Sequence, residues 1–343
     1  MFISNILCIL LFVSTQFTQS SILTDFQEWS RKFQKQYTNT DNFNQVYQKW
    51  TDNNAFIVKV NSQNHSYKLG HNPFSGMDLD EYKTFVLASK RPNPSPKHYV
   101  NSSITNTSLP LEVNWTKVGG VTPVKDQGYC GSCWSFSATG ALEGAYFNKY
   151  GKLDSFSEQQ LVDCDNLKNG GRDHGCNGGL MNNAFSWISK NGGLCSEFNY
   201  PYTSGVTGVP GTCTKSCPLV FGSQIASFVD VKPSSDTDMM NTLYKQPVSI
   251  AIDAESREFQ LYLSGVFTAT CGNTLDHGVL ATGYGVLNGL EYYSVKNSWS
   301  TSWGQAGYIL LGKGVDPNTN KLYNGGAGQC GMLMEPSYPV LLL

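Results

Sequence analysis

Cysteine is the residue type in this chain best suited to nucleophilic chemistry, and one cysteine stands apart by count. The 343-residue sequence has ten cysteines, and all but Cys8 follow Tyr129, which leaves nine in the body of the chain. An odd number in an oxidising compartment predicts four disulfides and one free thiol. Cys133 lies where a helix is expected to begin, and the unpaired N–H groups of a helix start favour the reactive thiolate. Because many buried cysteines lie near helix starts, a base must be identified as well.

Histidine is scarce in the body of the chain, which narrows the search for that base. After residue 109 the sequence has only His174, in a glycine-rich loop, and His277, directly before a predicted strand. A rigid element positions a catalytic group more accurately than a loop does. Asn297 ends the next predicted strand, where it can orient the imidazole, and Trp299 can shield that hydrogen bond from water. Taken singly, His277 and Asn297 can equally be ordinary polar residues at strand ends.

The elements that must position these residues change character along the chain. Helical periodicity covers 132–150, 157–163 and 180–190, whereas β-strand patterns cover 248–253, 278–286, 290–299 and 307–312. We expect Ser132 to cap the first helix and Gly151 to end it. Helices followed by strands predict an α+β protein with two lobes, and a cleft between lobes is a common place for an active site.

The N-terminal part of the chain has a different organisation. Residues 6–13 form an apolar run that is too short to span a bilayer, which predicts a signal peptide over 1–20. Residues 22–89 have a helical pattern, and residues 90–108 are rich in Pro, Ser, Asn and Thr, as in an extended linker. This layout predicts a removable pro-segment over 21–108 and a mature domain over 109–343. A small independent helical domain is the alternative.

Composition limits the possible partners. A formal net charge of −2 gives no reason to expect nucleic acid, and no later segment resembles a membrane span. Two histidines cannot supply the usual metal-ligand sets without consuming bridging cysteines, so we expect no metal and no cofactor. Asn-x-Ser/Thr glycosylation motifs fit the secretory route, and they lie at Asn64, Asn101, Asn106 and Asn114.

Ordered segments through most of the chain resemble papain-like cysteine proteases, and more closely their cathepsin L-like branch. The run from Gln127 to Trp134, QGYCGSCW, is similar to the active-site segment of that family, in which His and Asn follow roughly 130–150 residues later. His277 falls in that range and Asn297 lies slightly beyond it. Further matching segments are SFSEQQLVDC (155–164), GCNGGLM (175–181), LDHGV (275–279), KNSW (296–299) and WGQAGYILL (303–311). The resemblance implies a helical left lobe, a β-barrel-like right lobe and a helical N-terminal pro-segment.

The resemblance also implies the role of each candidate catalytic residue. Cys133 attacks the scissile carbonyl, His277 later protonates the leaving amine, and Asn297 orients His277. The Gln127 side chain and the Cys133 backbone N–H form the oxyanion hole. An acyl-enzyme forms, and water releases it. The implied activity is that of a cysteine endopeptidase made as a zymogen.

Substrate contacts follow from the same resemblance. Gly178 and Gly179 are expected to present backbone groups to an extended substrate, and Trp303 is also expected to contact it. An apolar side chain at the second position before the cut (P2) is expected, because the implied pocket walls are Leu180, Met181, Ala251, Leu275 and Gly278. Glu335 falls at the implied pocket floor, where it can accept a P2 arginine. The alternative is that Glu335 faces solvent.

Disulfides and partners complete the expectations. The family pattern implies the pairs Cys130–Cys176, Cys164–Cys213 and Cys271–Cys330. Cys195 and Cys217 are left as a fourth pair, although Cys213 and Cys217 are close enough in sequence to exchange roles. The implied partners are protein and peptide substrates, the chain's own propeptide as inhibitor, and cystatin-like inhibitors. We expect a monomer in the lysosome or outside the cell.

The pro-segment matches its family less well than the body does. The positions that fit are Trp50, Asn53, Ile57, Asn61, Gly70, Asn72 and Phe74. Asn42, Val46 and Gly76 stand where Glu, Arg and Asp are usual, which leaves the trigger of processing open. Two other functions are the alternatives. One is an inactive papain-like binding protein, which would lack Cys133, His277 or Gln127. The other is a disulfide-rich secreted scaffold without activity.

Overall fold

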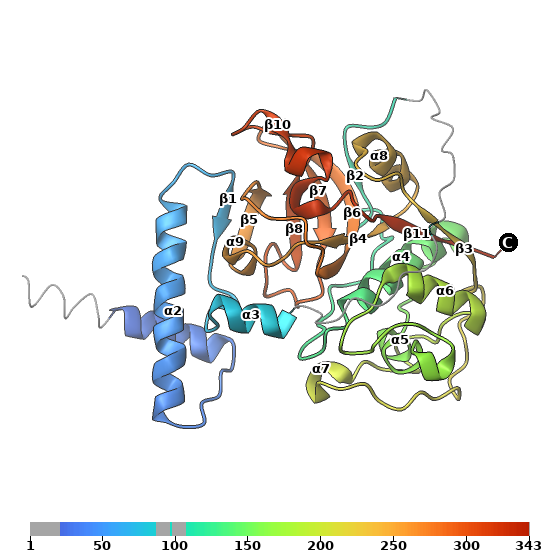
Figure 1. Ribbon diagram of the computed structural model, residues 1–343, viewed down its shortest axis with the longest axis horizontal. Helices are drawn as coiled ribbons and strands as arrows, with labels where there is room; N and C mark the ends of the chain where they lie inside the picture. The colour runs from blue at the N-terminus through green and yellow to red at the C-terminus, as the bar shows by residue number, and fades with distance from the viewer. Residues whose placement is uncertain (1–20, 87–96, 98–107, 343) are drawn as a thin grey trace, which may run out of the picture.

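The computed structural model describes residues 21–86, 97 and 108–342, and Figure 1 shows their arrangement. The pro-segment has a helix over 21–32, followed by α2 (Thr40–Asn61), β1 (Tyr67–Leu69) and α3 (Leu79–Val86). The helical pattern of 22–89 did not predict the strand β1. The proposed signal peptide and the motifs at Asn101 and Asn106 lie outside the described residues.

Three helices of the helical lobe begin and end within one or two residues of the predicted bounds. They are α4 (Cys133–Tyr150), α5 (Glu158–Cys164) and α6 (Met181–Asn191). Gly151 ends α4 with a left-handed φ of 64°, as predicted. Ser132 occupies the N-cap position, but its side chain makes no capping bond and instead contacts the Tyr202 hydroxyl. The capping prediction for Ser132 was therefore wrong, because a tertiary partner takes its hydroxyl.

Nine strands form one sheet in the order β1-β5-β8-β7-β6-β4-β11-β3, with β2 paired to β6. The described pairs are antiparallel except β5–β8. No pairing between described strands joins the two edge strands, β1 and β3. The sheet is therefore open, and the expected barrel-like lobe is not a closed barrel. Their bounds are β2 (Val113–Asn114), β3 (Ile225–Asp230), β4 (Val248–Ile252), β5 (Tyr262–Phe267), β6 (His277–Leu287), β7 (Leu290–Lys296), β8 (Tyr308–Gly312) and β11 (Ser337–Leu341).

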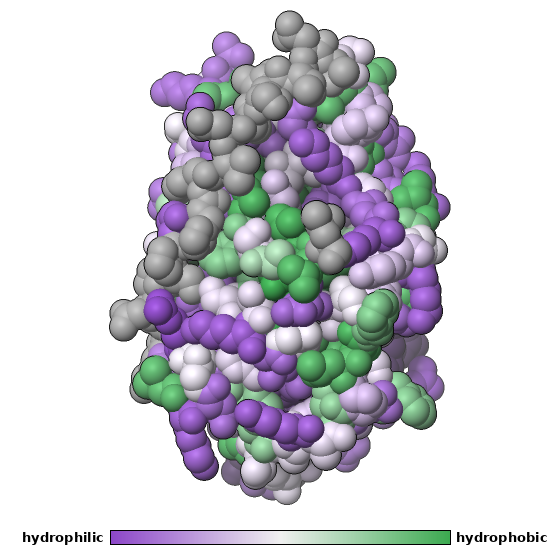
Figure 2. Space-filling model, turned by 90° about the vertical axis from the view of Figure 1, so that its right-hand side faces the viewer, coloured by the Kyte–Doolittle hydropathy of each residue, from purple (hydrophilic) through white to green (hydrophobic). Residues whose placement is uncertain are grey.

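Shorter elements connect these parts. They are η1 (Leu167–Asn169), α7 (Ser204–Thr207), α8 (Asp236–Lys245), α9 (Arg257–Gln260), β9 (Val315–Asp316), β10 (Lys321–Leu322), η2 (Tyr323–Gly326) and η3 (Gln329–Gly331). None of the helices in the described ranges is long and apolar enough to cross a membrane. Figure 2 shows hydrophilic side chains interspersed among the apolar ones on one face.

Two main hydrophobic cores lie on either side of the junction between α4 and β6. The helical-lobe core is built on α4, which contributes Trp134, and β6 contributes Leu280 to it. The sheet-lobe core includes Trp299 and, from the pro-segment, Phe74 and Tyr82. Strand β1 also adds to the sheet by pairing with β5. The pro-segment thus shares the core and the sheet of the sheet lobe, and α3 lies beside α2, below that lobe in the view of Figure 1.

Candidate active site

Cys133 is the first residue of α4 and is almost fully buried. The four disulfides are Cys130–Cys176, Cys164–Cys213, Cys195–Cys217 and Cys271–Cys330. They match the implied pairs and the proposed fourth, so Cys133 is the one free thiol among the described residues. The backbone N–H of Gly278 donates to its sulfur at 3.3 Å. Since Gly278 follows His277 directly, the thiol of one lobe lies beside the histidine of the other.

His277 begins β6, and Asn297 directly follows β7, the antiparallel neighbour of β6. The imidazole Nε2 and Asn297 Oδ1 are 2.8 Å apart, and Oδ1 also accepts the Ser298 N–H at 2.7 Å. Because Oδ1 can only accept, Nε2 carries the proton. The Trp299 ring stacks on the imidazole with 4.6 Å between centroids. Nδ1 is buried and has no hydrogen-bond partner among the described residues, so it is the nitrogen left to take a proton.

Burial sets the charge state of this pair. Desolvation raises the pKa of the Cys133 thiol to about 11 despite the N–H donated by Gly278, and it lowers the pKa of His277 to about 4 despite Asn297. Both groups are therefore neutral in this structure. The thiolate expected from the helix start is absent because complete burial outweighs the backbone donors.

Gln127 is buried and tied to the segment that follows Asn297. Its Oε1 accepts the Ser298 hydroxyl at 2.6 Å, and its backbone N–H donates to Ser298 O at 2.8 Å. Its Nε2 donates one hydrogen to Cys130 O at 3.1 Å. An amide nitrogen has two hydrogens, so a second donor remains for another acceptor.

One pocket gathers most of the residues expected to contact substrate. Beside Cys133 and His277 it is lined by Gly179, Leu180, Met181, Ala251, Leu275, Gly278 and Glu335. Gly179 needs its lack of a side chain, because a Cβ there would lie 2.3 Å from the Trp134 ring. Gly178 does not line the pocket but adopts a φ of 111° just before it. Trp303 is fully buried against Trp299, with 5.0 Å between ring centroids, and does not line this pocket.

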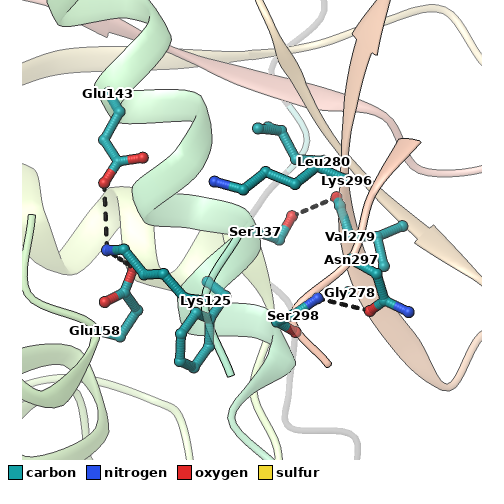
Figure 3. A pocket seen from close by; sticks show the side chains of 11 residues that line it. Lys125, Ser137, Glu143, Glu158, Gly278, Val279, Leu280, Lys296, Asn297 and Ser298 are labelled. Carbon is teal, nitrogen blue, oxygen red and sulfur yellow. Dashed lines mark hydrogen bonds and ion pairs between the residues drawn. The ribbon is translucent and has the colours of Figure 1, made fainter. Parts of the chain in front are cut away.

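A buried polar cluster between the lobes was not predicted from the sequence. Lys125 contacts Glu143 at 3.4 Å and Glu158 at 2.6 Å (Figure 3). Lys296 donates to Thr122 Oγ1 at 3.0 Å. Burial acts to lower the pKa of Lys125, but the neighbouring carboxylates raise it overall. The charged residues directly before Gln127 and Asn297 in the sequence are the one signal that could have indicated this cluster. Lysines exposed to solvent occur at the same positions relative to a motif, so the signal is not specific.

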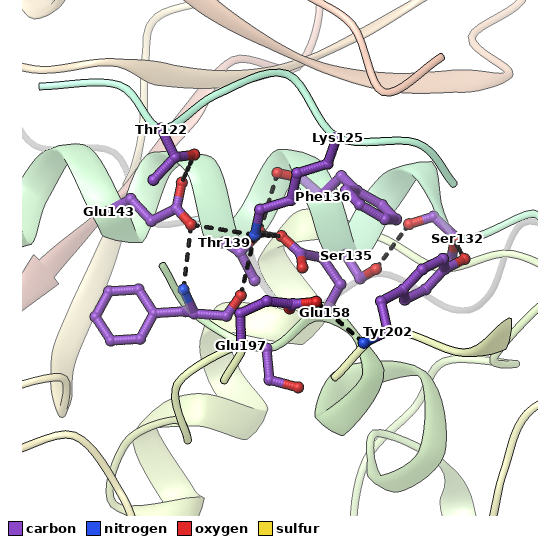
Figure 4. A network of polar contacts seen from close by, with 12 residues as sticks. Thr122, Lys125, Ser132, Ser135, Phe136, Thr139, Glu143, Glu158, Glu197 and Tyr202 are labelled. Carbon is purple, nitrogen blue, oxygen red and sulfur yellow. Dashed lines mark hydrogen bonds and ion pairs between the residues drawn. The ribbon is translucent and has the colours of Figure 1, made fainter. Parts of the chain in front are cut away.

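The cluster reaches the active-site segment through Tyr202 (Figure 4). The Tyr202 N–H donates to Glu197 Oε1 at 3.0 Å, and its hydroxyl donates to Gln127 O at 2.8 Å. The same hydroxyl lies 2.6 Å from Ser132 Oγ. Tyr202 therefore connects the carboxyl groups of the cluster to Gln127 and Ser132, which lie on either side of Cys130 in the sequence.

The pro-segment contacts the lobe that carries His277. The rings of Phe74 and Tyr82 meet Trp299 edge-on, and the Tyr82 hydroxyl donates to Ala254 O at 2.9 Å. Gly76 has no room for an aspartate, because a Cβ there would lie 2.7 Å from Trp29 and 2.8 Å from Val46. Packing of apolar groups thus replaces the charged residues usual at these positions.

The remaining sequence expectations concern glycosylation and metals. Asn64 is exposed, whereas Asn114 is half-buried and its side chain accepts the Lys117 N–H at 3.0 Å. Within 21–86, 97 and 108–342, no group of three or more His, Cys, Asp or Glu side chains is arranged to hold a metal ion.

Comparison with known proteins gives the family. Residues 109–340 match the papain family cysteine protease, and residues 26–82 match the cathepsin propeptide inhibitor domain. The "Probable cysteine protease RD21B" of Arabidopsis thaliana is 40% identical over 334 residues, covering 95% of this chain and 68% of that protein. The "Senescence-specific cysteine protease SAG39" of Oryza sativa subsp. indica is 39% identical, covering 91% of this chain and 88% of that protein. The structure of "Recombinant stem bromelain precursor" is 33% identical, with a TM-score of 0.81, and the match covers 93% of this chain and 99% of that one. The chain belongs to the papain family of cysteine proteases and is a proenzyme with an N-terminal inhibitory propeptide.

Proposed function

We propose that the chain is an endopeptidase whose nucleophile is Cys133 and whose base is His277. The observation that carries this proposal is a pairing within the described part of the chain. Its single free thiol there lies beside an imidazole whose Nε2 is held by Asn297 and whose Nδ1 has no partner among the same residues. Nδ1 takes the thiol proton, and the sulfur attacks the scissile carbonyl. The resulting oxyanion receives hydrogen bonds from the Cys133 N–H and from Gln127 Nε2. Losing one such donor typically costs about 2.7–4 kcal/mol of transition-state stabilisation.

The rest of the reaction uses the same groups. The imidazolium returns its proton to the leaving amine, which departs and leaves a thioester on Cys133. His277 then takes a proton from water as the water attacks the thioester. The carbon–sulfur bond breaks, the carboxylic acid product leaves, and the Cys133 sulfur recovers its proton from the imidazolium. Asn297 and Trp299 keep the ring in one orientation throughout. Gly178 and Gly179 bind the backbone of an extended peptide, and Trp303 supports Trp299 from behind.

Burial explains why the proenzyme is inactive on this proposal. With both groups desolvated, the neutral thiol and neutral imidazole are favoured, and a neutral thiol is a poor nucleophile. Removing the pro-segment hydrates the pair and favours thiolate and imidazolium. We place the signal peptide at 1–20, the propeptide at 21–108 and the mature enzyme at 109–343. Disulfides and glycosylation motifs support a secretory route that ends in a lysosome-like compartment or outside the cell, where cystatin-like inhibitors can meet the enzyme.

A thiol-directed epoxide tests the nucleophile. After acid processing, we expect stoichiometric labelling at Cys133 and a mature N-terminus near Leu109, both read by mass spectrometry. Cys133→Ser should lower kcat/KM roughly 10⁴-fold or more, as removal of a catalytic nucleophile typically does. The matched control is Ser135→Ala, two residues further along the same helix, which should be labelled normally. Labelling at another residue, or activity that survives Cys133→Ser, would contradict the assignment.

A further inference from the structure

We propose that Asp165 and Asp173 share one proton, and that this shared proton holds the Leu180 wall of the substrate pocket so that substrate binding weakens as pH rises. The inference rests on the proposed function, because it assigns these two acids as positioning residues for its substrate. Asp165 directly follows α5, and Asp173 lies in the loop that leads to α6. Both are buried, with exposed fractions of 0% and 1%.

The hydrogen-bond pattern locates the proton. The side chains of Asp165 and Asp173 are hydrogen-bonded to each other, which two carboxylates cannot achieve without a proton between them. Oδ1 of Asp165 accepts the Arg172 N–H at 3.1 Å. Oδ1 of Asp173 accepts the Leu180 N–H at 3.1 Å and the Asn183 amide at 2.9 Å. The Oδ2 atoms are both buried and lack any other partner, so the proton lies between them.

Asp173 connects this proton to the substrate pocket. Leu180 is the N-cap residue of α6, and both Leu180 and Met181 line the pocket beside Cys133. The neighbouring His174 N–H donates to Gly178 O at 2.9 Å, which fixes the other end of the same stretch. The Asp173 carboxyl therefore sets the position of the backbone that faces the substrate. It does not contact the substrate or the reacting atoms.

Charged groups around the pair do not remove the need for a proton. Burial raises the pKa of Asp165. The positive charge of Lys190 in α6 acts to lower that pKa but does not outweigh burial. Burial and the nearby Asp165 charge raise the pKa of Asp173 well above its usual value, so Asp173 is the proton donor. Asp163 of α5 is engaged elsewhere, with Gln159, Tyr200 and Gly211. The remaining charged or titratable groups on adjoining segments are Lys168, Arg172 and His174 at the surface and Asp230, which contacts Asn182.

The direction of the pH effect follows from the raised pKa. Asp173 is protonated in the native loop, whereas an aspartate in a disordered loop titrates near 3.8. The ordered loop is therefore most favoured below that value and becomes less favoured as pH rises toward the raised pKa. The change concerns the pocket wall and leaves Cys133, His277 and Asn297 in place. KM should rise while kcat stays nearly constant.

In Asp173→Asn, the amide N–H takes the place of the shared proton and donates to Asp165 at any pH. In Asp165→Asn, the amide N–H donates to Asp173 instead. Between about pH 5 and pH 7.5, the KM of the mature wild-type enzyme for a P2-leucine peptide should rise roughly tenfold, and that of D173N less than about twofold. Glu291→Gln, an exposed carboxylate paired with Lys313 on the other lobe, should follow the wild type. Parallel KM profiles for D173N and wild type would overturn the inference, and D165N decides it if D173N does not fold.

An infrared measurement separates this inference from the proposed function. In the proenzyme carrying Cys133→Ser, which needs no activity, a protonated-carboxyl stretch should persist near neutral pH and weaken in D173N and in D165N. If neither variant alters the carboxyl band, no proton is shared there and the inference fails even if Cys133 is the nucleophile. Activity that survives Cys133→Ser would instead overturn the proposed function while leaving the carboxyl band interpretable.

Discussion

Two acidic side chains line the pocket. They are Glu335 and Asp276, the residue that follows Leu275. Glu335 shares that pocket with Leu180 and Met181, so an apolar wall and a carboxyl group face the same space. A P2 leucine can use the wall, whereas a P2 arginine can also bond to the carboxyl group. Its place in the pocket lining supports the proposal that Glu335 reaches the substrate, and the alternative is that it faces solvent.

Replacing Glu335 by Ala should therefore change selectivity and leave general activity intact. We expect kcat/KM for P2-arginine peptides to fall roughly tenfold, since a hydrogen bond to a charged group contributes about 1.5–3 kcal/mol. P2-leucine peptides should change less than about twofold. Steady-state kinetics on matched peptides gives both values, with Glu291→Ala as a control at an exposed carboxylate. An unchanged arginine-to-leucine ratio would show that Glu335 does not reach the substrate.

At the residue scale, the sequence indicated the groups whose chemistry is scarce. One odd cysteine and two histidines left few alternatives for Cys133 and His277, and β-strand periodicity placed Asn297 beside His277. The Asp165–Asp173 pair was not predictable, because its contact depends on closure of a loop by the Gly171 N–H to Asn166 O bond. The neutral state of Cys133 was missed because burial is a property of the folded molecule.

At the scale of elements, α3 is the part of the pro-segment that docks beside the active site. Its Tyr82 hydroxyl bonds to Ala254 O, and its ring covers Trp299, the shield of the His277–Asn297 bond. The main helices and strands were predicted closely because their periodicity extends over many residues. The strand β1 was not, since three residues give little pattern and its partner β5 lies far along the chain.

Tyr82→Phe should loosen this docked helix without altering the enzyme beneath it. Loss of the buried hydrogen bond leaves Ala254 O without that donor and should cost about 1–3 kcal/mol of docking free energy. We expect the full proenzyme to process itself at least about fivefold faster at a fixed acid pH. Thr84→Ala, on the same helix but exposed and bonded only within it, should process at the wild-type rate. Equal rates for Tyr82→Phe and wild type would mean that α3 docking does not limit activation.

At the scale of the whole molecule, a buried polar cluster lies at the junction of the lobes beside apolar contacts, such as that of Leu280 from β6 with the helical-lobe core. Glu158 receives hydrogen bonds from Lys125 and Thr139, both at 2.6 Å. It is also hydrogen-bonded to Glu197, and Oε2 of each glutamate has no other partner among the described residues. Burial raises the pKa of Glu158 to about 7, with Lys125 opposing the shift and Glu197 adding to it. The Glu158 carboxyl at the junction of the lobes is therefore protonated below about pH 7.

This arrangement predicts a pH-dependent stability that one substitution should remove. The folded-state pKa of Glu158 is raised, so its contribution to stability is fully present below the ordinary value of 4.5 and is lost as pH rises toward about 7. Glu197→Gln places an amide donor beside Glu158 and removes a like charge. At pH 7.5 it should stabilise the protein by about 1 kcal/mol, a Tm gain of roughly 2 °C, whereas near pH 4.5 the difference should vanish. Calorimetry on the Cys133→Ser proenzyme avoids self-cleavage, with the exposed Glu28→Gln as control. Wild-type and Glu197→Gln curves that stay parallel from pH 4.5 to 7.5 would exclude this pH-dependent contribution of Glu158.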